Sequence, residues 1–464
     1  MTVDRNLQII GNINTMISIT ELYSLFRQSA GVTTDSREVR KGEMFFALRG
    51  ENFDGNDYAS KALEAGAAYA VVSSDSRVAS ESVKDSRIIP VEDTLSTLKE
   101  LARTHRCSMT VEGKRLPVIA LTGTNGKTTT KELINAVLSV KYRVTATRGN
   151  LNNEIGVPLS LLSITPETRI AVIEMGASHP GDIESLVSVA MPDYGLVTNV
   201  GKGHLLGFGS FEGVRKTKGE LYDYIGRNGG KIFLNEDLPY LREMAEERGI
   251  DDVVPYGVEY DGAKILPVSP DTPFLKMEIP VSCGESTVLE THLVGQYNAG
   301  NVMAALSIGR YFGVPVEDCL KAIASYIPSN NRSQMSKTGR NTLIIDAYNA
   351  NPVSMEAALS SLESIPSDNK SVMLGDMLEL GTESGPEHDK IVERVCCMHL
   401  QEAYFVGQEF SAALSRCKAN KDRCISFGTS GQLADYLKEH PVAGSVILIK
   451  GSHGIHMEKV IPEL

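Results

Sequence analysis

Short apolar runs that alternate with helical patterns constrain the fold of this chain more than any other feature. Leu116–Leu121 is such a run, and Ile170–Glu174 and Tyr194–Thr198 follow it, with a helical pattern at 180–190 between them. Continuous apolar runs of this length are typical of strands that are buried on both faces of a parallel sheet. Strands that alternate with helices therefore predict an α/β fold.

The alternation recurs along the chain and divides it into three predicted domains. Residues 16–112 form a small α/β domain, 113–328 contain the parallel sheet just described, and 329–464 contain a second doubly wound, Rossmann-like sheet. Within the middle domain, 250–295 has short alternating runs and prolines, which favour an antiparallel edge or a separate small sheet. The further predicted strands are Glu43–Leu48, Ala67–Val72, Lys231–Leu234, Thr342–Asp346, Ser371–Leu374, Ala403–Val406 and Val446–Ile449.

Helix signals complete this outline. Helical spacing begins after Thr20, which is the expected N-cap of the first helix. Residues 1–15 are polar and poorly patterned, so the first domain is expected to begin at Met16. Further helices are predicted at Tyr58–Ala65 and from Thr128 to Val140.

Composition and charge favour a soluble cytoplasmic protein. The chain has 464 residues and a net charge of -12, which argues against a broad nucleic-acid-binding surface. No apolar run approaches the ~20 residues that a membrane-spanning helix needs, and we see no secretory signal. The seven cysteines include no Cys-x-x-Cys pair, so we expect reduced structural thiols and no structural zinc site.

The segment between the Leu116–Leu121 run and the next helix is a candidate phosphate loop. It reads Gly-Thr-Asn-Gly-Lys-Thr, and glycines let backbone N–H groups curl around phosphate oxygens at a helix N-terminus. The spacing is more compact than GxxxxGK[ST], whose first glycine would fall at Leu121, and a chance glycine turn is the alternative. Lys127 would reach the outer phosphates of ATP, and the Thr128 hydroxyl would bind magnesium. The predicted nucleotide-binding residues of the loop are Gly123, Thr124, Asn125, Gly126, Lys127, Thr128 and Thr129.

Three further residues are candidates for the metal and its surroundings. Glu174 ends a predicted strand, and a carboxylate beside a phosphate loop is well placed to hold Mg²⁺. His204 lies in the glycine-rich segment after another strand, where ligands gather in parallel sheets. Lys218 lies on a predicted helix. Taken singly, each has an ordinary alternative: a surface glutamate, a structural histidine and a solvated lysine.

The order of these motifs resembles one protein family along nearly the whole chain from Met16. The Gly123 loop is followed by Glu174, the His204 segment and Lys218, and then by Asn298 with Asn301, Arg332 and Asp346. In this order the chain is similar to the Mur ligases, the ATP-dependent amide-forming enzymes of peptidoglycan precursor synthesis. Folylpolyglutamate synthases are similar more distantly. The resemblance implies a UDP-sugar-binding first domain, a P-loop ATPase-type central domain and a Rossmann-like ligase domain.

Several stretches favour one branch of this family. They are Thr34–Arg37, Gly42–Gly50, Gly149–Pro158, Asp346–Pro352 and Leu374–Gly381. They resemble the branch that joins D-alanyl-D-alanine to a UDP-N-acetylmuramoyl-tripeptide. The Asp-Asn-Pro-Arg tetrapeptide of the branch that adds diaminopimelate is not found in the sequence. Lysine and diaminopimelate both remain open as the third residue of the tripeptide.

The family also implies roles for single residues. Asn298 and Asn301 would contact adenine, Asp346 the ribose hydroxyls, and Arg332 the terminal phosphate. Helix capping is the alternative for the two asparagines and for Asp346, and a surface position in a linker is the alternative for Arg332. Lys218 would carry a carbamate, which turns a cation into an anion that helps to hold a second Mg²⁺. The implied substrate-binding residues are Ser36, Arg37, Asn150, Asn153, Asn349, Asn351, Asp376 and Glu379. A surface turn is the alternative for Ser36 and Arg37, and turn or capping roles are the alternative for Asp376 and Glu379.

The implied reaction has two steps. The tripeptide carboxylate attacks the γ-phosphate of ATP to give an acyl phosphate and ADP, while Lys127, Arg332 and magnesium neutralise the developing charge. The amine of the dipeptide then attacks the acyl carbon, and phosphate leaves. We assign no base for the amine proton, because metal ligation fits His204 better. A monomer that closes around its substrates is expected.

Three other functions fit part of the pattern. One is a ligase of the same fold with a different amine or a folate substrate. The second is a noncatalytic nucleotide-binding protein, against which the joint presence of Lys127, Glu174, His204 and Lys218 argues. The third is a P-loop hydrolase or kinase, which would turn over ATP without an amine.

Overall fold

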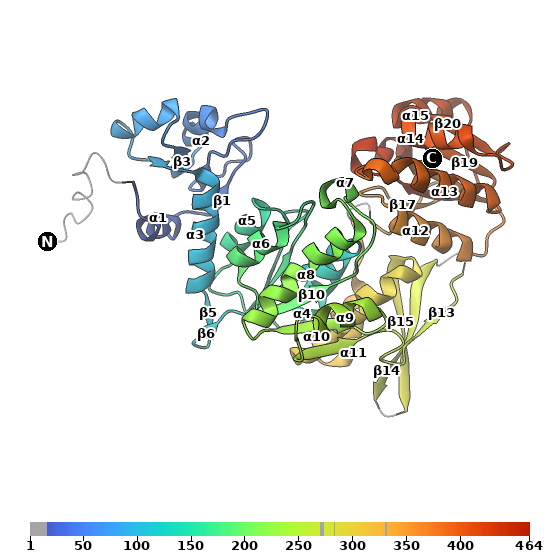
Figure 1. Ribbon diagram of the computed structural model, residues 1–464, viewed down its shortest axis with the longest axis horizontal. Helices are drawn as coiled ribbons and strands as arrows, with labels where there is room; N and C mark the ends of the chain where they lie inside the picture. The colour runs from blue at the N-terminus through green and yellow to red at the C-terminus, as the bar shows by residue number, and fades with distance from the viewer. Residues whose placement is uncertain (1–15, 270–272, 283, 330–331) are drawn as a thin grey trace.

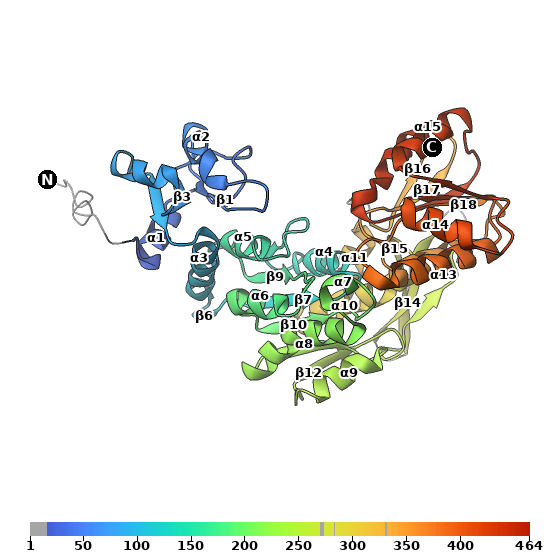
Figure 2. The same ribbon diagram turned by 45° about the horizontal axis from the view of Figure 1, so that its top comes forward.

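The computed structural model describes residues 16–269, 273–282, 284–329 and 332–464, and Figure 1 shows their arrangement. Within these residues the strands form three sheets that consist mainly of parallel strands, one in each predicted domain, and two small antiparallel sheets. In both Figure 1 and Figure 2 the N-terminal and C-terminal sheets lie at opposite ends of the central one. The predicted α/β class is therefore confirmed, while residues 1–15 lie outside the described part.

The N-terminal domain is a four-stranded parallel sheet in the order β1-β2-β3-β4. Its first helix begins two residues earlier than predicted, because Ser18 rather than Thr20 is the N-cap. The Ser18 hydroxyl accepts from the Glu21 N–H, and the Glu21 carboxylate accepts from the Ser18 N–H in return. The elements are α1 Ile19–Phe26, β1 Val32–Thr33, β2 Met44–Phe46, α2 Ala59–Glu64, β3 Tyr69–Ser73, β4 Ile88–Val91 and α3 Thr94–Ser108, with 3₁₀ turns η1 Gly55–Tyr58 and η2 Arg77–Val83.

Helix α3 joins this domain to the central one through a buried arginine. The Arg106 guanidinium donates to the carbonyls of Ala190 and Met191 and pairs with Asp193 at 2.8 Å. Burial lowers the pKa of Arg106, and these three acceptors compensate the buried charge. A short antiparallel pair follows the helix, β5 Thr110–Val111 with β6 Lys114–Arg115.

The central domain is a six-stranded parallel sheet in the order β12-β11-β10-β7-β9-β8. One face packs against α3, α5, α6, α8 and α9, and the other packs against α4, α10, α11 and the small sheet β13-β14-β15. The separate antiparallel sheet expected within 250–295 is thus present. The strands are β7 Val118–Thr122, β8 Val144–Ala146, β9 Ile170–Glu174, β10 Tyr194–Val197, β11 Lys231–Asn235, β12 Val253–Tyr256, β13 Lys264–Leu266, β14 Phe274–Ser282 and β15 Glu285–Val294. The helices are α4 Lys127–Leu138, α5 Gly156–Leu162, α6 Asp182–Ala190, α7 Leu205–Phe208, α8 Phe211–Arg227, α9 Pro239–Glu246, η3 Gln296–Asn298, α10 Ala299–Tyr311 and α11 Val316–Ser325.

The C-terminal domain is a six-stranded sheet in the order β16-β17-β21-β18-β19-β20, in which only β16 runs antiparallel to its neighbour. Helices α12, α13 and α14 cover one face, and α15 with η6 covers the other. The strands are β16 Gln334–Lys337, β17 Thr342–Asp346, β18 Lys370–Gly375, β19 Glu402–Val406, β20 Cys424–Phe427 and β21 Val446–Lys450. The helices are α12 Pro352–Ser364, η4 Gly381–Glu383, α13 Ser384–Cys397, α14 Gln408–Arg416, α15 Ser430–Glu439, η5 His453–Ile455 and η6 Met457–Glu463.

The structure also bears on the expectations for the cysteines and for membrane-spanning helices. Cys283 lies outside the described residues, and the other six cysteines are free thiols. Three of them meet in the C-terminal domain, where Cys396 Sγ lies 3.9 Å from both Cys417 Sγ and Cys424 Sγ. Burial raises the pKa of Cys396 to about 12, which keeps it a thiol. Among the described residues, no helix is long and apolar enough to cross a membrane.

Candidate active site

A cleft of about 890 Å³ lies between the central and C-terminal domains. It is formed where the carboxyl ends of β7, β9 and β10 face those of β17 and β21, which is where parallel sheets bind ligands. The predicted site residues that line it are Thr124, Asn125, Gly126, Lys127, Thr129, Asn150, Asn153, Glu174, His204, Asn298, Asn301, Arg332, Asp346, Asn349 and Glu379. Most of the sequence-predicted set is thus brought to one place.

The phosphate loop follows β7 and leads into α4, as predicted. Gly123 has a φ of 150°, and a Cβ there would lie 1.9 Å from Thr198 Oγ1. Only glycine fits this position, because the Thr198 hydroxyl closes the loop by donating to the Asn125 carbonyl at 2.7 Å. The result is a tight turn whose backbone opens onto the cleft.

The Lys127 side chain folds back over its own loop. Its ammonium group donates to the carbonyls of Gly123 at 2.8 Å and Thr124 at 3.2 Å. Burial lowers the pKa of Lys127 to about 8, and Arg332 adds to this effect while Glu174 opposes it. Lys127 is therefore a cation whose charge is poorly compensated, which favours an anionic ligand in the cleft.

Thr128 and Glu174 are suited to hold a divalent cation. The Thr128 hydroxyl donates to Glu174 Oε1 at 3.2 Å, and the Asn152 amide donates to the same oxygen at 2.8 Å. The other carboxylate oxygen, Oε2, is buried and has no hydrogen bond to any described residue. A buried, unsatisfied carboxylate oxygen beside a threonine hydroxyl fits the oxygen ligands that Mg²⁺ prefers.

His204 and Lys218 both lie next to Phe208. The His204 ring packs edge-on against Phe208, with centroids 6.4 Å apart, and Lys218 Nζ lies 5.5 Å from the Phe208 centroid. Lys218 is 2% exposed, and burial lowers its pKa well below the usual value, with Lys127 contributing. The charged form of this amine is therefore less favoured than that of an exposed lysine. The described residues contain no cluster of three or more His, Cys, Asp and Glu suited to a metal.

The loop that carries His204 also contacts the C-terminal domain. His204 Nδ1 lies 2.5 Å from the Glu379 carboxylate, which holds the pKa of Glu379 below its usual range. Lys202 donates to the buried Glu387 carboxylate at 2.8 Å. The loop therefore joins the two domains at the edge of the cleft.

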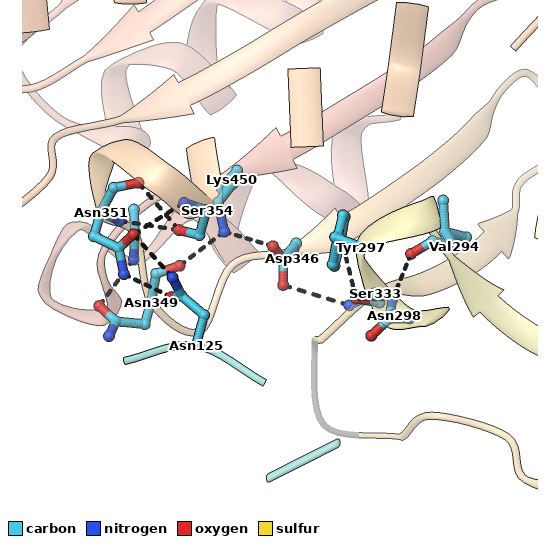
Figure 3. A network of polar contacts seen from close by, with 11 residues as sticks. Asn125, Val294, Tyr297, Asn298, Ser333, Asp346, Asn349, Asn351, Ser354 and Lys450 are labelled. Carbon is cyan, nitrogen blue, oxygen red and sulfur yellow. Dashed lines mark hydrogen bonds and ion pairs between the residues drawn. The ribbon is translucent and has the colours of Figure 1, made fainter. Parts of the chain in front are cut away.

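A second contact between the domains pairs two asparagine side chains. Asn351 Nδ2 donates to Asn125 Oδ1 at 2.7 Å, while Asn351 Oδ1 caps α12 by accepting from the Ser354 N–H. Figure 3 shows this pair beside the helix. Asn351 is not among the residues that line the cleft, and its observed contacts are the cap of α12 and an interdomain bond. Substrate binding by Asn351 stays a prediction.

A chain of polar contacts runs along the C-terminal side of the cleft (Figure 3). The buried Lys450 ammonium pairs with Asp346 at 2.5 Å, and the other Asp346 oxygen accepts from the Ser333 N–H at 3.4 Å. The Ser333 hydroxyl contacts Tyr297 at 2.9 Å and accepts from Asn298 Nδ2 at 3.3 Å. These contacts fix Asp346 at the end of β17, facing the central domain.

Asn298 and Asn301 are buried against the phosphate loop. The Asn301 amide donates to Asn298 Oδ1, and its own oxygen accepts from the Thr130 hydroxyl at 3.0 Å. A Cβ on Gly126 would lie 2.6 Å from that oxygen. Neither side chain caps α10, and their adenine contacts stay a prediction.

The remaining predicted residues lie away from the cleft lining. Asp376 is buried, and its carboxylate accepts from the N–H groups of Glu409 and Phe410 at the start of α14. Ser36 lies in the N-terminal domain, and Arg37 beside it pairs with Asp35. Lys218, Thr128 and Gly123 are not among the residues that line the cleft. Dipeptide binding by Asp376 and uridine binding by Ser36 and Arg37 stay predictions.

Sequence reasoning did not single out several cleft residues. Ser178 and His179 precede α6. Their backbone N–H groups donate to the Asp182 carboxylate, which holds this segment at the start of the helix. Tyr297 and Tyr348 line the cleft from the opposite side. The sequence did contain a signal for them. Ser178, His179 and Tyr348 follow the ends of predicted strands, and Tyr297 precedes Asn298.

Comparison with known proteins decides the family. Three family models match: the Mur ligase family catalytic domain over 28–106, the Mur ligase middle domain over 121–309, and the Mur ligase glutamate ligase domain over 331–453. The UDP-N-acetylmuramoyl-tripeptide–D-alanyl-D-alanine ligase of Bacillus subtilis (strain 168) is 33% identical over 98% of this chain and 98% of its own length. The chain belongs to the Mur ligase family. The resemblance read from the motifs is confirmed.

Other relatives and solved structures also match nearly the whole length of this Mur ligase. The ligase of the same name from Escherichia coli (strain K12) is 33% identical over 93% of each chain. A crystal structure of MurF from Acinetobacter baumannii matches with a TM-score of 0.80 and 28% identity over 93% of this chain and 92% of that one. MurF from Thermotoga maritima, solved in complex with ADP, matches with a TM-score of 0.79 and 27% identity over 95% and 97%.

The ion pair between Lys202 and Glu387 yields a first prediction. Lys202→Met removes one contact between the domains of this Mur ligase and is expected to lower kcat/KM about two- to fivefold, in line with a partly exposed ion pair. Lys390→Met is the matched control, because Lys390 pairs with the same carboxylate at 3.0 Å from within the C-terminal domain. Steady-state kinetics of both variants measure the effect. An equal loss in both would mean that the contact between domains has no special role.

Proposed function

We propose that this protein joins D-alanyl-D-alanine to a UDP-N-acetylmuramoyl-tripeptide at the expense of ATP, in peptidoglycan precursor synthesis. The observation that carries the proposal is the single cleft in which the phosphate loop, Glu174 and Lys127 face Arg332 and Asp346 across two domains. Relatives named for this reaction, which match over nearly their whole length, support the choice of substrates. A monomer in the cytoplasm, where ATP is available, is the expected form.

In this proposal the central domain holds the phosphates and the adenine, and the C-terminal domain holds the ribose. The Gly123–Thr128 loop would bind the phosphates of ATP, Asn298 and Asn301 the adenine, and Asp346 the ribose. Thr128 and Glu174 would hold Mg²⁺, which when bound supplies positive charge next to the phosphates. Lys218, as a carbamate, and His204 would hold a second ion.

The chemistry needs a carboxylate to become an electrophile. The carboxylate of the tripeptide attacks the γ-phosphate, the bond to ADP breaks, and an acyl phosphate forms. Lys127 and Arg332 neutralise the charge on the transferring group, because both cations face the cleft. The dipeptide amine then attacks the acyl carbon and phosphate leaves. Asn349 and Glu379, on the C-terminal side, are the proposed contacts of the dipeptide, and Asn150 and Asn153 those of the tripeptide.

The test follows phosphate release from MgATP by the purified protein. The UDP-muramoyl-tripeptide is present throughout, D-alanyl-D-alanine is added or omitted, and mass spectrometry detects the product. Release that requires both substrates, with a product at the summed mass less one water, supports the proposal. Release without the dipeptide would indicate a hydrolase, and ATP binding without turnover of any pair would indicate a noncatalytic protein. Parallel reactions with lysine- and diaminopimelate-containing tripeptides identify the third residue.

Nucleotide binding is expected to take up protons near pH 8. The free protein holds the Lys127 pKa at about 8, and phosphates beside the ammonium group would raise it. Between these two pKa values the complex binds more protons, so affinity falls as the pH rises above about 8. Calorimetry of ADP binding at about pH 8.5, in two buffers of different ionisation enthalpy, measures the uptake. Lys127→Met should abolish the difference in binding enthalpy between the two buffers. An unchanged proton uptake in that variant would contradict the assignment of the uptake to Lys127.

A further inference from the structure

Arg332 has an aromatic partner in the cleft that the proposed function does not yet use. Its guanidinium carbon lies 3.8 Å from the centroid of the Tyr348 ring. Arg332 precedes β16 and Tyr348 follows β17, and both line the cleft. The distance is well within the range in which a cation is attracted to the face of an aromatic ring.

The electrostatic surroundings make this ring contact important for Arg332. No ion pair between Arg332 and a carboxylate is present among the residues the structure describes. The charge of Arg332 also acts on Lys127, whose pKa it lowers, so two cations face the same cleft. Without a phosphate between them they repel each other. An attractive ring face therefore opposes the tendency of Arg332 to turn away.

Two sets of contacts support Tyr348, one to the segment that carries it and one to its ring. Lys450, which is 1% exposed, pairs with Asp346 at 2.5 Å and donates to the Asn349 carbonyl at 3.0 Å, so it bridges the residues on both sides of Tyr348. Figure 3 shows this bridge at the end of β17. The His453 ring stacks on Tyr348 with centroids 5.7 Å apart and an interplanar angle of 25°. These contacts therefore support the position of Tyr348 without a ligand.

We propose that Tyr348 is a positioning residue, whose ring holds the Arg332 guanidinium where it meets the transferring phosphoryl group. The inference rests on the proposed function, because it takes Arg332 to contact the terminal phosphate. Tyr348 touches no reacting atom in this account. Its effect comes from preorganisation, which places a flexible cation in one orientation before the reaction.

The test removes the ring and then restores it. Tyr348→Leu keeps an apolar side chain without a π face and is expected to lower kcat about tenfold, the range of a cation–π contact of about 1.4 kcal/mol. Tyr348→Phe keeps the ring and should retain most of kcat. ADP lacks the terminal phosphate, so its affinity should be unchanged in Tyr348→Leu. A loss of ADP affinity would overturn the proposal, since it would place the ring against the nucleoside.

A double-mutant cycle separates positioning from general packing. In the Arg332→Gln background, Tyr348→Leu should cause little further loss, because the residue acts through Arg332. Full additivity would overturn the proposal. Phenylalanine with a fluorinated ring at position 348 keeps the shape and weakens the ring's negative face, so a stepwise fall in kcat with fluorination is expected even if Tyr348→Leu folds poorly. If wild-type protein makes no amide product, the proposed function fails; if it does and these variants match it, only the present inference fails.

Discussion

Replacement of Lys127 by methionine is expected to lower kcat about a thousandfold, in line with the loss of a group that neutralises charge in phosphoryl transfer. Lys127 begins α4, directly beneath the phosphate loop, and faces the same cleft as Arg332. Methionine keeps the length and the apolar contacts of the side chain but carries no charge. The loss should therefore appear mainly in the chemical step, measured as kcat for the formation of the amide.

The stability of Lys127→Met should be close to that of the wild-type protein. Burial disfavours the charged form of Lys127, so removal of the charge does not remove a net stabilising interaction. Thermal unfolding without nucleotide measures this. Lys141→Met is the matched control for activity, because Lys141 is exposed and follows the opposite end of α4. A variant that keeps wild-type kcat, or one that loses activity only because it unfolds, would contradict the role assigned to Lys127.

The sequence predicts the strands that lead into the site because their apolar runs have sharp ends. Ile170–Glu174 and Thr342–Asp346 begin and end where predicted, each closing on the carboxylate that faces the cleft. Strand β16, Gln334–Lys337, was missed, because an edge strand of four residues with polar side chains lacks the buried pattern. The N-cap of α1 was placed two residues late, although Ser18 and Glu21 have the spacing of a capping box.

Side-chain roles are harder to predict because they depend on contacts between distant parts of the chain. Asp376 ends a predicted strand like Asp346, but its carboxylate is taken by the first N–H groups of α14. A Cβ at Gly407 would lie 2.1 Å from that carboxylate, so the approach depends on a glycine 31 residues away. The pairing of Asn125 with Asn351 joins two domains and has no local signal. The motif order could identify the family, but these contacts needed the structure.

Lys218→Met is expected to abolish measurable ligation, with a fall in kcat of at least about a thousandfold if the lysine holds a metal ion as a carbamate. The physical basis is the depressed pKa of Lys218, which burial keeps well below the usual lysine value. A neutral amine can add CO₂, giving the carbamate anion and one proton. Lys216→Met is the matched control, since Lys216 is exposed on the same helix, two residues away.

The sign of the pH dependence distinguishes a carbamate from a simple lysine. As the pH falls through the lowered pKa, the amine is protonated, CO₂ is released and activity should decline; a cationic lysine that bound phosphate would instead become more effective. Carbon-13 NMR of protein equilibrated with labelled bicarbonate should show a carbamate signal that is absent in Lys218→Met and present in Lys216→Met. Wild-type activity in Lys218→Met, or no such signal in active protein, would remove the carbamate from the site. In that case the burial of Lys218 beside Phe208 would be a matter of packing, and Thr128 with Glu174 would have to hold the metal without it.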